Sequence, residues 1–160
     1  MPEITALLHT NNDALRLGRA LETLRPCDEI LVVDHDSHDA TLRIAREYGA
    51  RILPSGADTT PAHCLQSARN DWILCLEPRE SLTEGLEASL YEWKSELPSQ
   101  VTGASFSVFL RDETPGGWLS LPSPQTRLVP RNWNQWNGHF PADQPSALTL
   151  EGELLRFLLP

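Results

Sequence analysis

Short apolar runs alternate with amphipathic segments along the first 98 residues of the chain. The apolar runs predict strands at residues 4–8, 29–33, 50–53 and 72–76. The amphipathic segments predict helices at about residues 13–24, 39–48, 60–68 and 81–97. Four alternations of strand and helix predict right-handed crossovers and a mostly parallel sheet flanked by helices. The pattern therefore indicates the α/β fold class.

Local signals at the helix ends support these boundaries. Thr60 followed by Pro61 is typical of an N-cap and a first helical residue. Gly49 is a natural left-handed residue after the second helix. Ser81 with Glu84 resembles a capping box, so we expect Ser81 to begin the fourth helix.

The pattern changes after Thr102. Residues 104–111 place apolar side chains on alternate positions, as an antiparallel strand does, and the Pro-Gly-Gly at 115–117 predicts a turn. Strands are also predicted at residues 118–121 and 126–129, and loops with a short helix near residues 151–158 are predicted for the remainder. The last third of the chain should therefore add antiparallel strands to the sheet.

The length of the chain limits the number of domains, and its net charge limits the classes of binding partner. A chain of 160 residues fits a single domain, residues 1–160, with βα units in residues 1–98 and a shorter second region in residues 99–160. The formal net charge of −9 argues against a nucleic acid or an anionic membrane as the main partner, because both require clustered Lys and Arg.

The expected compartment is the cytoplasm. No apolar run approaches the roughly 20 residues that cross a bilayer. The N-terminus has no basic region ahead of an apolar stretch, so we expect no signal peptide and no transmembrane segment. The three cysteines are odd in number and lack metal-site spacing, which suits a reducing compartment.

Polar clusters directly follow three of the predicted strands, at His9–Asn12, Asp34–Asp39 and Glu77–Glu80. Ligands of open parallel sheets bind beyond the carboxyl ends of the strands, so these clusters mark a candidate site. Helix capping and solvation would also explain such residues. Asp34 favours a site, because it follows a hydrophobic strand directly and has no evident capping role.

Several common motifs are missing from the sequence. The first strand–helix turn lacks Gly-x-Gly-x-x-Gly, which argues against a nicotinamide cofactor. A Gly-rich phosphate loop ending in Lys-Ser/Thr and a Gly-x-Ser-x-Gly nucleophile elbow are also missing.

Three segments resemble family 2 glycosyltransferases, closest to the bacterial lipopolysaccharide-core glucosyltransferase type. Residues 4–24 (ITALLHTNNDALRLGRALETL) resemble the opening of that family. Residues 28–41 (DEILVVDHDSHDAT) resemble its Asp-Glu-Ile-Val-Val-Val-Asp-Ser-Gly-Ser-Thr-Asp-Gly-Thr. Residues 71–83 (DWILCLEPRESLT) resemble its Asp-Trp-Val-Leu-Phe-Leu-Asp-Ala-Asp-Glu-x-Leu-Thr. The likeness covers about residues 4–96.

The resemblance implies a Rossmann-like GT-A fold and transfer of sugar, with inversion, from a nucleotide-diphosphate sugar to an acceptor such as a cell-surface polysaccharide or lipopolysaccharide. Thr10 would line the nucleoside pocket, and the Asp34 carboxylate would accept from a base N–H. The residues implied to bind the nucleotide are Thr10, Asn12, Asp34, Asp36 and Asp39.

The chain departs from the family where an Asp-x-Asp motif holds Mg²⁺ or Mn²⁺ on the diphosphate. Glu77 keeps an oxygen ligand, but Arg79 offers no lone pair to a cation. In one interpretation, Arg79 binds the diphosphate directly through paired hydrogen bonds, with Glu80 beside it. In the other, Arg79 forms an ion pair with Glu77 or Glu80 at the surface. Both interpretations stay open, and so does the need for a metal.

The acceptor side also departs from the family. The family's Arg-Asn before the fourth strand falls on residues 61–62 (Pro-Ala), and its His-Glu falls on His139 and the residue after it. Asp143 is the nearest acid that would serve as catalytic base, although a solvated loop acid is the simpler reading. Arg127, Trp136 and His139 are the remaining acceptor-side candidates, with loop packing as the alternative for Trp136.

Two functions remain. The first is a divergent glycosyltransferase, and the second is a non-catalytic relative that keeps the fold and binds a nucleotide or sugar. His35 and His38 with the acids around them suggest a transition-metal site, but their spacing fits no known site and helix capping is favoured.

Overall fold

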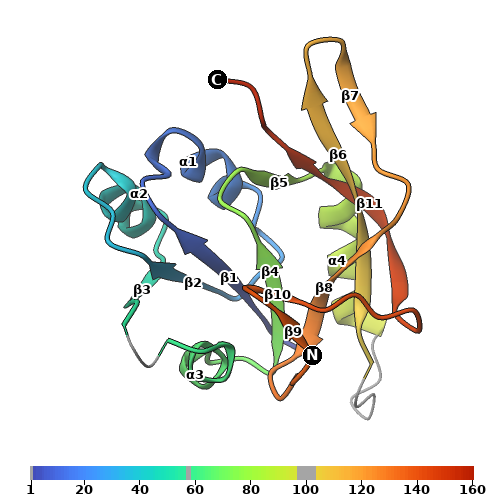
Figure 1. Ribbon diagram of the computed structural model, residues 1–160. Coiled ribbons are helices and arrows are strands. Elements are labelled where there is room, and N and C mark those ends of the chain that lie inside the picture. The colour runs from blue at the N-terminus through green and yellow to red at the C-terminus, as the bar shows by residue number, and fades with distance from the viewer. Residues whose placement is uncertain (1, 57–58, 97–103) are drawn as a thin grey trace.

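A nine-stranded sheet forms the centre of the computed structural model, which describes residues 2–56, 59–96 and 104–160 (Figure 1). The strands of the sheet are β1 (Ile4–Thr10), β2 (Glu29–Asp34), β3 (Arg51–Pro54), β4 (Trp72–Leu76), β5 (Glu80–Leu82), β6 (Phe106–Thr114), β7 (Gly117–Ser120), β8 (Gln125–Pro130) and β11 (Leu148–Arg156). The helices are α1 (Ala14–Glu22), α2 (Thr41–Glu47), α3 (Pro61–Ser67) and α4 (Glu84–Glu96). A separate hairpin pairs β9 (Trp136–Asn137) with β10 (Phe140–Pro141).

The first half of the chain has the predicted topology. Its strands lie in the order β3-β2-β1-β4, and every pairing among them is parallel. The buried apolar residues of β1, β2 and β4 explain this arrangement, because a strand buried on both faces needs helices above and below it. The α/β fold class is confirmed, and the carboxyl ends of these strands share one edge.

The second half extends the sheet with mixed pairings. The order continues β8-β6-β11-β5, in which β8 is antiparallel to both β4 and β6. The hairpin of β6 and β7 turns at Pro115 and Gly116, as the sequence predicts. The predicted antiparallel strands of the C-terminal third are therefore confirmed.

The helix predicted near residues 151–158 is wrong, because this segment lies in strand β11. β11 pairs parallel with β6 and antiparallel with β5, so its backbone groups find partners on both sides. Gly152 has a φ of +91°, which no right-handed helix accommodates, and it lies where the register of β11 shifts. Long-range pairing thus overrides the local helical pattern.

Each face of the sheet carries its own apolar layer. α1, α2 and α4 cover one face, where Leu17, Ala45 and Leu90 are buried. α3 and the β9–β10 hairpin cover the other face, where Leu65 is buried and Phe140 is partly buried. None of the helices in the described part of the chain is long and apolar enough to cross a membrane.

The helix-end signals have mixed outcomes. The Thr60 hydroxyl accepts from the His63 N–H at 3.2 Å, and Gly49 has a φ of +78°, so both predictions are confirmed. The Ser81 prediction is wrong, because Ser81 lies in β5 and its buried hydroxyl has no hydrogen-bond partner among the described residues. Thr83 begins α4 instead, accepting from the Leu86 N–H at 3.2 Å.

Gly152 offers a test of the corrected strand. A Cβ at this position would lie 2.3 Å from the Leu86 nitrogen. The positive φ of Gly152 is also a backbone conformation that residues with a side chain rarely adopt. We expect Gly152→Ala to lower the free energy of unfolding by about 3 kcal/mol, because backbone atoms of α4 cannot yield as a side chain does. Gly116→Ala is the matched control, since its Cβ would enter open space. Equal urea midpoints for the two variants would contradict this packing.

Candidate functional site

Thr10 and Asp34 meet at the carboxyl edge of the sheet. The parallel register of β1 and β2 places them opposite each other, and both are buried. The Thr10 hydroxyl donates to Asp34 Oδ1 at 2.7 Å. Ser37 donates to the same carboxylate through its hydroxyl at 2.6 Å and its backbone N–H at 3.0 Å. Asp34 therefore does have a local structural role, contrary to expectation, because it holds the loop after β2.

The hydrogen bonds to Asp34 also set its charge. Burial alone would raise the pKa of the Asp34 carboxyl, but the Ser37 and Thr10 bonds outweigh it and lower that pKa below its usual range. The group is thus a fixed, ionised acceptor at neutral pH. Such an acceptor suits the N–H group of a bound ligand.

The other three predicted nucleotide residues shape the loops around Asp34. Asn12 and Asp36 adopt φ values of 54° and 59°, a left-handed conformation that Asn and Asp tolerate. Asn12 joins the two loops, donating from its N–H to the Ser37 hydroxyl and accepting from His38 N–H at 2.8 Å. The Asp36 side chain is exposed.

Asp39 stabilises the starts of two helices. Its carboxylate accepts from the Thr41 N–H at 2.9 Å at the start of α2 and from the Ala14 N–H at 3.2 Å at the start of α1. Its hydrogen bonds lower the pKa of the carboxyl, and the bond with the Thr41 side chain contributes most. The capping role expected of Asp39 is present in the structure.

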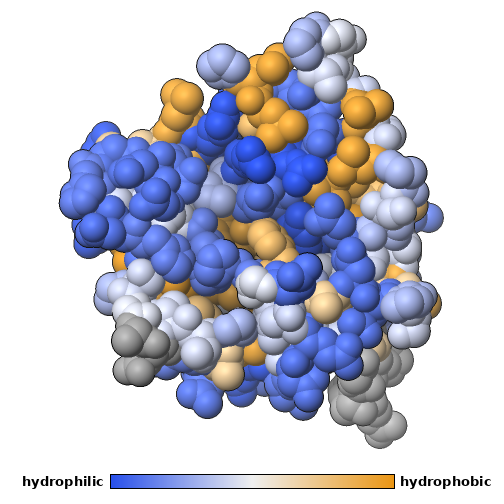
Figure 2. Space-filling model, in the orientation of Figure 1, coloured by the Kyte–Doolittle hydropathy of each residue, from blue (hydrophilic) through white to orange (hydrophobic). Residues whose placement is uncertain are grey.

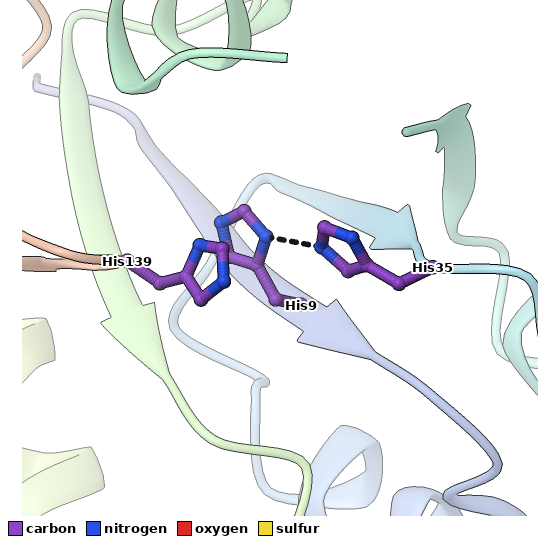
Figure 3. Close-up of side chains that lie close together, drawn as sticks. All are labelled: His9, His35 and His139. Atoms are coloured by element: carbon purple, nitrogen blue, oxygen red, sulfur yellow. Dashed lines mark hydrogen bonds between the residues drawn. The ribbon is translucent and has the colours of Figure 1, made fainter. Parts of the chain in front are cut away.

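Three histidines gather beside this cluster, on the opposite face of the sheet edge. Figure 3 shows His9 of β1 between His35, from the loop after β2, and His139, from the β9–β10 hairpin. His9 Nδ1 lies 2.9 Å from His35 Nε2, and the His9 and His139 rings stack with centroids 3.8 Å apart. The sequence marks His35 and His139 separately, but their meeting with His9 depends on the hairpin folding over the sheet.

Burial keeps the central imidazole neutral. Desolvation is the main cause that lowers the pKa of His9 to about 3, and the nearby His139 and His35 contribute less. Desolvation, followed by His35, also lowers the pKa of His139. At neutral pH these two rings therefore carry lone pairs and no positive charge.

Glu77 lies between two arginines at the end of β4. Arg79 Nη2 is 3.4 Å from one carboxylate oxygen of Glu77, and Arg156 Nη1 is 3.5 Å from the other. Arg156 also makes two hydrogen bonds to Asp112, at 2.7 and 3.0 Å. The Arg79 side chain is 42% exposed, and among the described residues its one polar contact is the 3.4 Å approach to Glu77. Arg156 was missed from the sequence, because its segment was expected to be helical.

Glu80 and Arg127 do not line the edge as ligand-facing groups. Glu80 is 0% exposed and forms a two-pronged ion pair with the guanidinium of Arg127, at 2.6 and 2.8 Å. Arg127 also donates to the Cys75 carbonyl and lies over the Phe140 ring. The placement of Glu80 with the diphosphate and of Arg127 with the acceptor is therefore corrected to a buried structural pair.

The remaining acceptor-side candidates, Asp143 and Trp136, make contacts that fix their loops against the sheet. One carboxylate oxygen of exposed Asp143 accepts from the Thr126 N–H at 2.9 Å, which ties the loop to β8. Trp136 is partly buried against the sheet, and its ring N–H donates to the Trp133 carbonyl at 3.0 Å. Figure 2, drawn in the orientation of Figure 1, shows a recess near the centre of the molecule with hydrophilic side chains around it.

Some of the curated relatives of the chain are named as glycosyltransferases. An uncharacterised glycosyltransferase of Rickettsia felis is 33% identical over 91 residues, which cover 54% of this chain and 32% of the relative. A TPR repeat-containing protein of Synechococcus elongatus is 35% identical over 133 residues, which cover 80% of this chain and 31% of that protein. The chain thus matches about a third of the length of these relatives. No known family profile matches the chain.

Solved structures share the fold at low identity. S. aureus TarS superposes with a TM-score of 0.52 and 16% identity, covering 81% of this chain and 28% of that one. Mannosyl-3-phosphoglycerate synthase from Rubrobacter xylanophilus has a TM-score of 0.50 and 22% identity, covering 69% and 39%. These likenesses confirm the predicted GT-A fold. The curated relatives bear out the resemblance to glycosyltransferases over about half of this chain.

The Glu80–Arg127 pair predicts a large change in stability. Arg127→Met should lower the free energy of unfolding by about 3–5 kcal/mol, because it leaves the Glu80 carboxylate buried without its partner. The double variant Glu80→Leu/Arg127→Met should lose less than the single one, since neither charge remains. Arg43→Met removes the exposed Arg43–Glu47 pair and should change stability little. Denaturant unfolding measures all three, and a double variant at least as unstable as Arg127→Met would refute the argument.

Proposed function

We propose that the protein binds a nucleotide-diphosphate sugar at the carboxyl edge of β1, β2 and β4 and transfers the sugar to an acceptor. The observation that carries this proposal is the Thr10–Asp34–Ser37 cluster, in which an ionised carboxylate is fixed at the end of two parallel strands. The edge of an open α/β sheet is where such folds bind ligands. The curated glycosyltransferase relatives support the same reaction class.

The diphosphate would be held by Arg79 and not by a divalent cation. A hard cation needs several oxygen ligands, but Arg79 supplies none and both oxygens of Glu77 face guanidinium groups. The residues at this position therefore do not fit a resident Mg²⁺ or Mn²⁺. The Arg79 side chain is partly exposed and its contact with Glu77 is long, at 3.4 Å, so it can turn toward a diphosphate and make paired hydrogen bonds.

In the transfer itself, the acceptor hydroxyl would form a bond to the anomeric carbon while the bond to the diphosphate breaks. A base must take the proton of the hydroxyl, and Asp143 remains the candidate. Its side chain is exposed, and one of its oxygens is engaged by the Thr126 N–H. The acceptor itself is not specified by these residues.

A non-catalytic nucleotide- or sugar-binding protein is the second candidate. The observation in its favour is that Glu77 and Asp143 both have protein partners, while Glu80 is locked in the buried pair. Under this candidate the nucleoside cluster would keep its binding role without turnover.

Nucleotide binding is the first test. Thermal unfolding should shift upward with uridine or guanosine diphosphate or one of their sugars, and the shift should be the same with and without Mn²⁺. Arg79→Ala should weaken binding about tenfold or more, because a hydrogen bond to a charged group is lost. No shift with any of these nucleotides would overturn the binding proposal, and a shift that requires Mn²⁺ would overturn the role of Arg79.

The base pocket is checked in the same titrations. Asp34→Ala should also weaken binding, whereas Asp71→Ala, an exposed acid ahead of β4, should leave affinity unchanged. Undiminished binding by Asp34→Ala would show that the nucleoside lies elsewhere.

Turnover separates the two candidates. A transferase should hydrolyse its nucleotide sugar slowly to free sugar and nucleoside diphosphate, at a rate above background that falls sharply in Arg79→Ala, because Arg79 is proposed to hold the diphosphate leaving group. Once an acceptor is known, Asp143→Asn should slow transfer about 100-fold or more, because general base catalysis typically contributes at least that factor. Nucleotide-sugar binding without any release of sugar would favour the non-catalytic candidate.

A further inference from the structure

Three of the five histidines of the chain converge on one point, although they come from three separate segments. One nitrogen from each of His9, His35 and His139 can be chosen so that all three atoms lie within 4.8 Å of one another. We propose that these three imidazoles bind a transition-metal dication of the Zn²⁺ type, at a site distinct from the Glu77 position.

The distances fit a shared metal. In a tetrahedral zinc site with Zn–N bonds of 2.0–2.1 Å, ligand nitrogens lie about 3.3 Å apart. The His9 Nδ1 to His35 Nε2 distance is 2.9 Å, and a nitrogen of His139 lies within 4.8 Å of the other two ligand atoms, so the His139 ring would turn inward on binding. Without a metal, these two nitrogens must share a proton. When a metal ion binds, the donor ring takes the tautomer with its proton on the other ring nitrogen, so both facing nitrogens offer a lone pair to the ion.

The surroundings suit a metal ion bound by imidazoles. His9 and His35 are partly buried and His139 is exposed, so the cluster is shielded from water on one side and open to solvent on the other. Asp34 directly precedes His35 in the chain, so an acidic residue lies next to one of the proposed ligands. Three histidines leave a fourth position for water or an anionic oxygen, as in zinc sites that keep an open coordination position.

The type of donor separates this site from the one that the family resemblance implies. Imidazole nitrogen suits Zn²⁺, Co²⁺, Ni²⁺ or Cu²⁺, whereas Mg²⁺ and Mn²⁺ prefer oxygen. The three histidines lie at the ends of β1 and β2 and in the hairpin, while Glu77 follows β4. A metal here would fasten the β9–β10 hairpin to the edge of the sheet (Figure 3).

Direct metal titration tests the proposal. The probe is Zn²⁺ added to the tag-free full chain after removal of metals with a chelator, in the absence of nucleotide. We expect one Zn²⁺ per chain by calorimetry. Co²⁺ should give the intense visible absorption of a tetrahedral site, whereas Mg²⁺ should not compete. Because no nucleotide is present, the result does not depend on the proposed function.

Variants of the histidines identify the ligands. His139→Ala is the main variant, because His139 is exposed and its removal leaves the core intact. It should weaken Zn²⁺ binding more than about tenfold, since even residues that only support a metal ligand often matter that much. His35→Ala should do the same. His38→Ala and His63→Ala, the other two histidines, are matched controls and should bind as the wild type does.

The hairpin supplies an independent readout. Zn²⁺ should protect residues 136–141 from hydrogen exchange in the wild type and not in His139→Ala, with circular dichroism confirming that both are folded. Absence of stoichiometric Zn²⁺ binding would overturn the proposal, and so would unchanged affinity in His139→Ala. Equal losses in the His38 and His63 controls would also overturn it.

Discussion

Arg127 of β8 and Glu80 of β5 form an ion pair that is buried away from water. Glu80 also accepts from the Glu77 N–H, and Arg127 also donates to the carbonyl of Cys75 in β4. The Phe140 ring covers the guanidinium. One buried interaction thus joins the end of β4, the loop that carries Glu77, β8 and the β9–β10 hairpin. Removing either charge would leave the other unpaired, so the candidate site depends on both.

Side-chain alternation divides the carboxyl edge into two chemically different faces. Successive residues of a strand point to opposite sides, so Thr10 and His9 diverge at the end of β1. Thr10 reaches Asp34 on the side of α1 and α2, whereas His9 reaches His35 and His139 beneath the hairpin. The first face is an oxygen-rich, ionised cluster, and the second is a set of neutral nitrogens. We propose a nucleoside for the first and a metal for the second.

The chain matches the resembled family at one end of the proposed site and departs from it at the other. Thr10 and Asp34 keep the residue types implied by the resemblance and form a buried hydrogen bond at the end of β1 and β2. At the end of β4, Arg79 adds a positive charge where the resembled family has a cation ligand, and Glu77 pairs with it and with Arg156. The positive charge that a diphosphate requires is then supplied by a guanidinium. This exchange is the physical basis of the metal-independent binding proposed above.

Local patterns in the sequence were sufficient for the first half of the fold and for the position of Asp34 at the strand end. Apolar strands, helix periods and caps act over a few residues, so the chain itself encodes them. Tertiary structure alone decided the rest. Residues 148–156 became β11 because two distant strands satisfy their backbone, and Glu80 became buried because Arg127 arrives from β8. The histidine cluster likewise depends on a hairpin that packs across the sheet, and contacts of that range leave no periodic trace in the sequence.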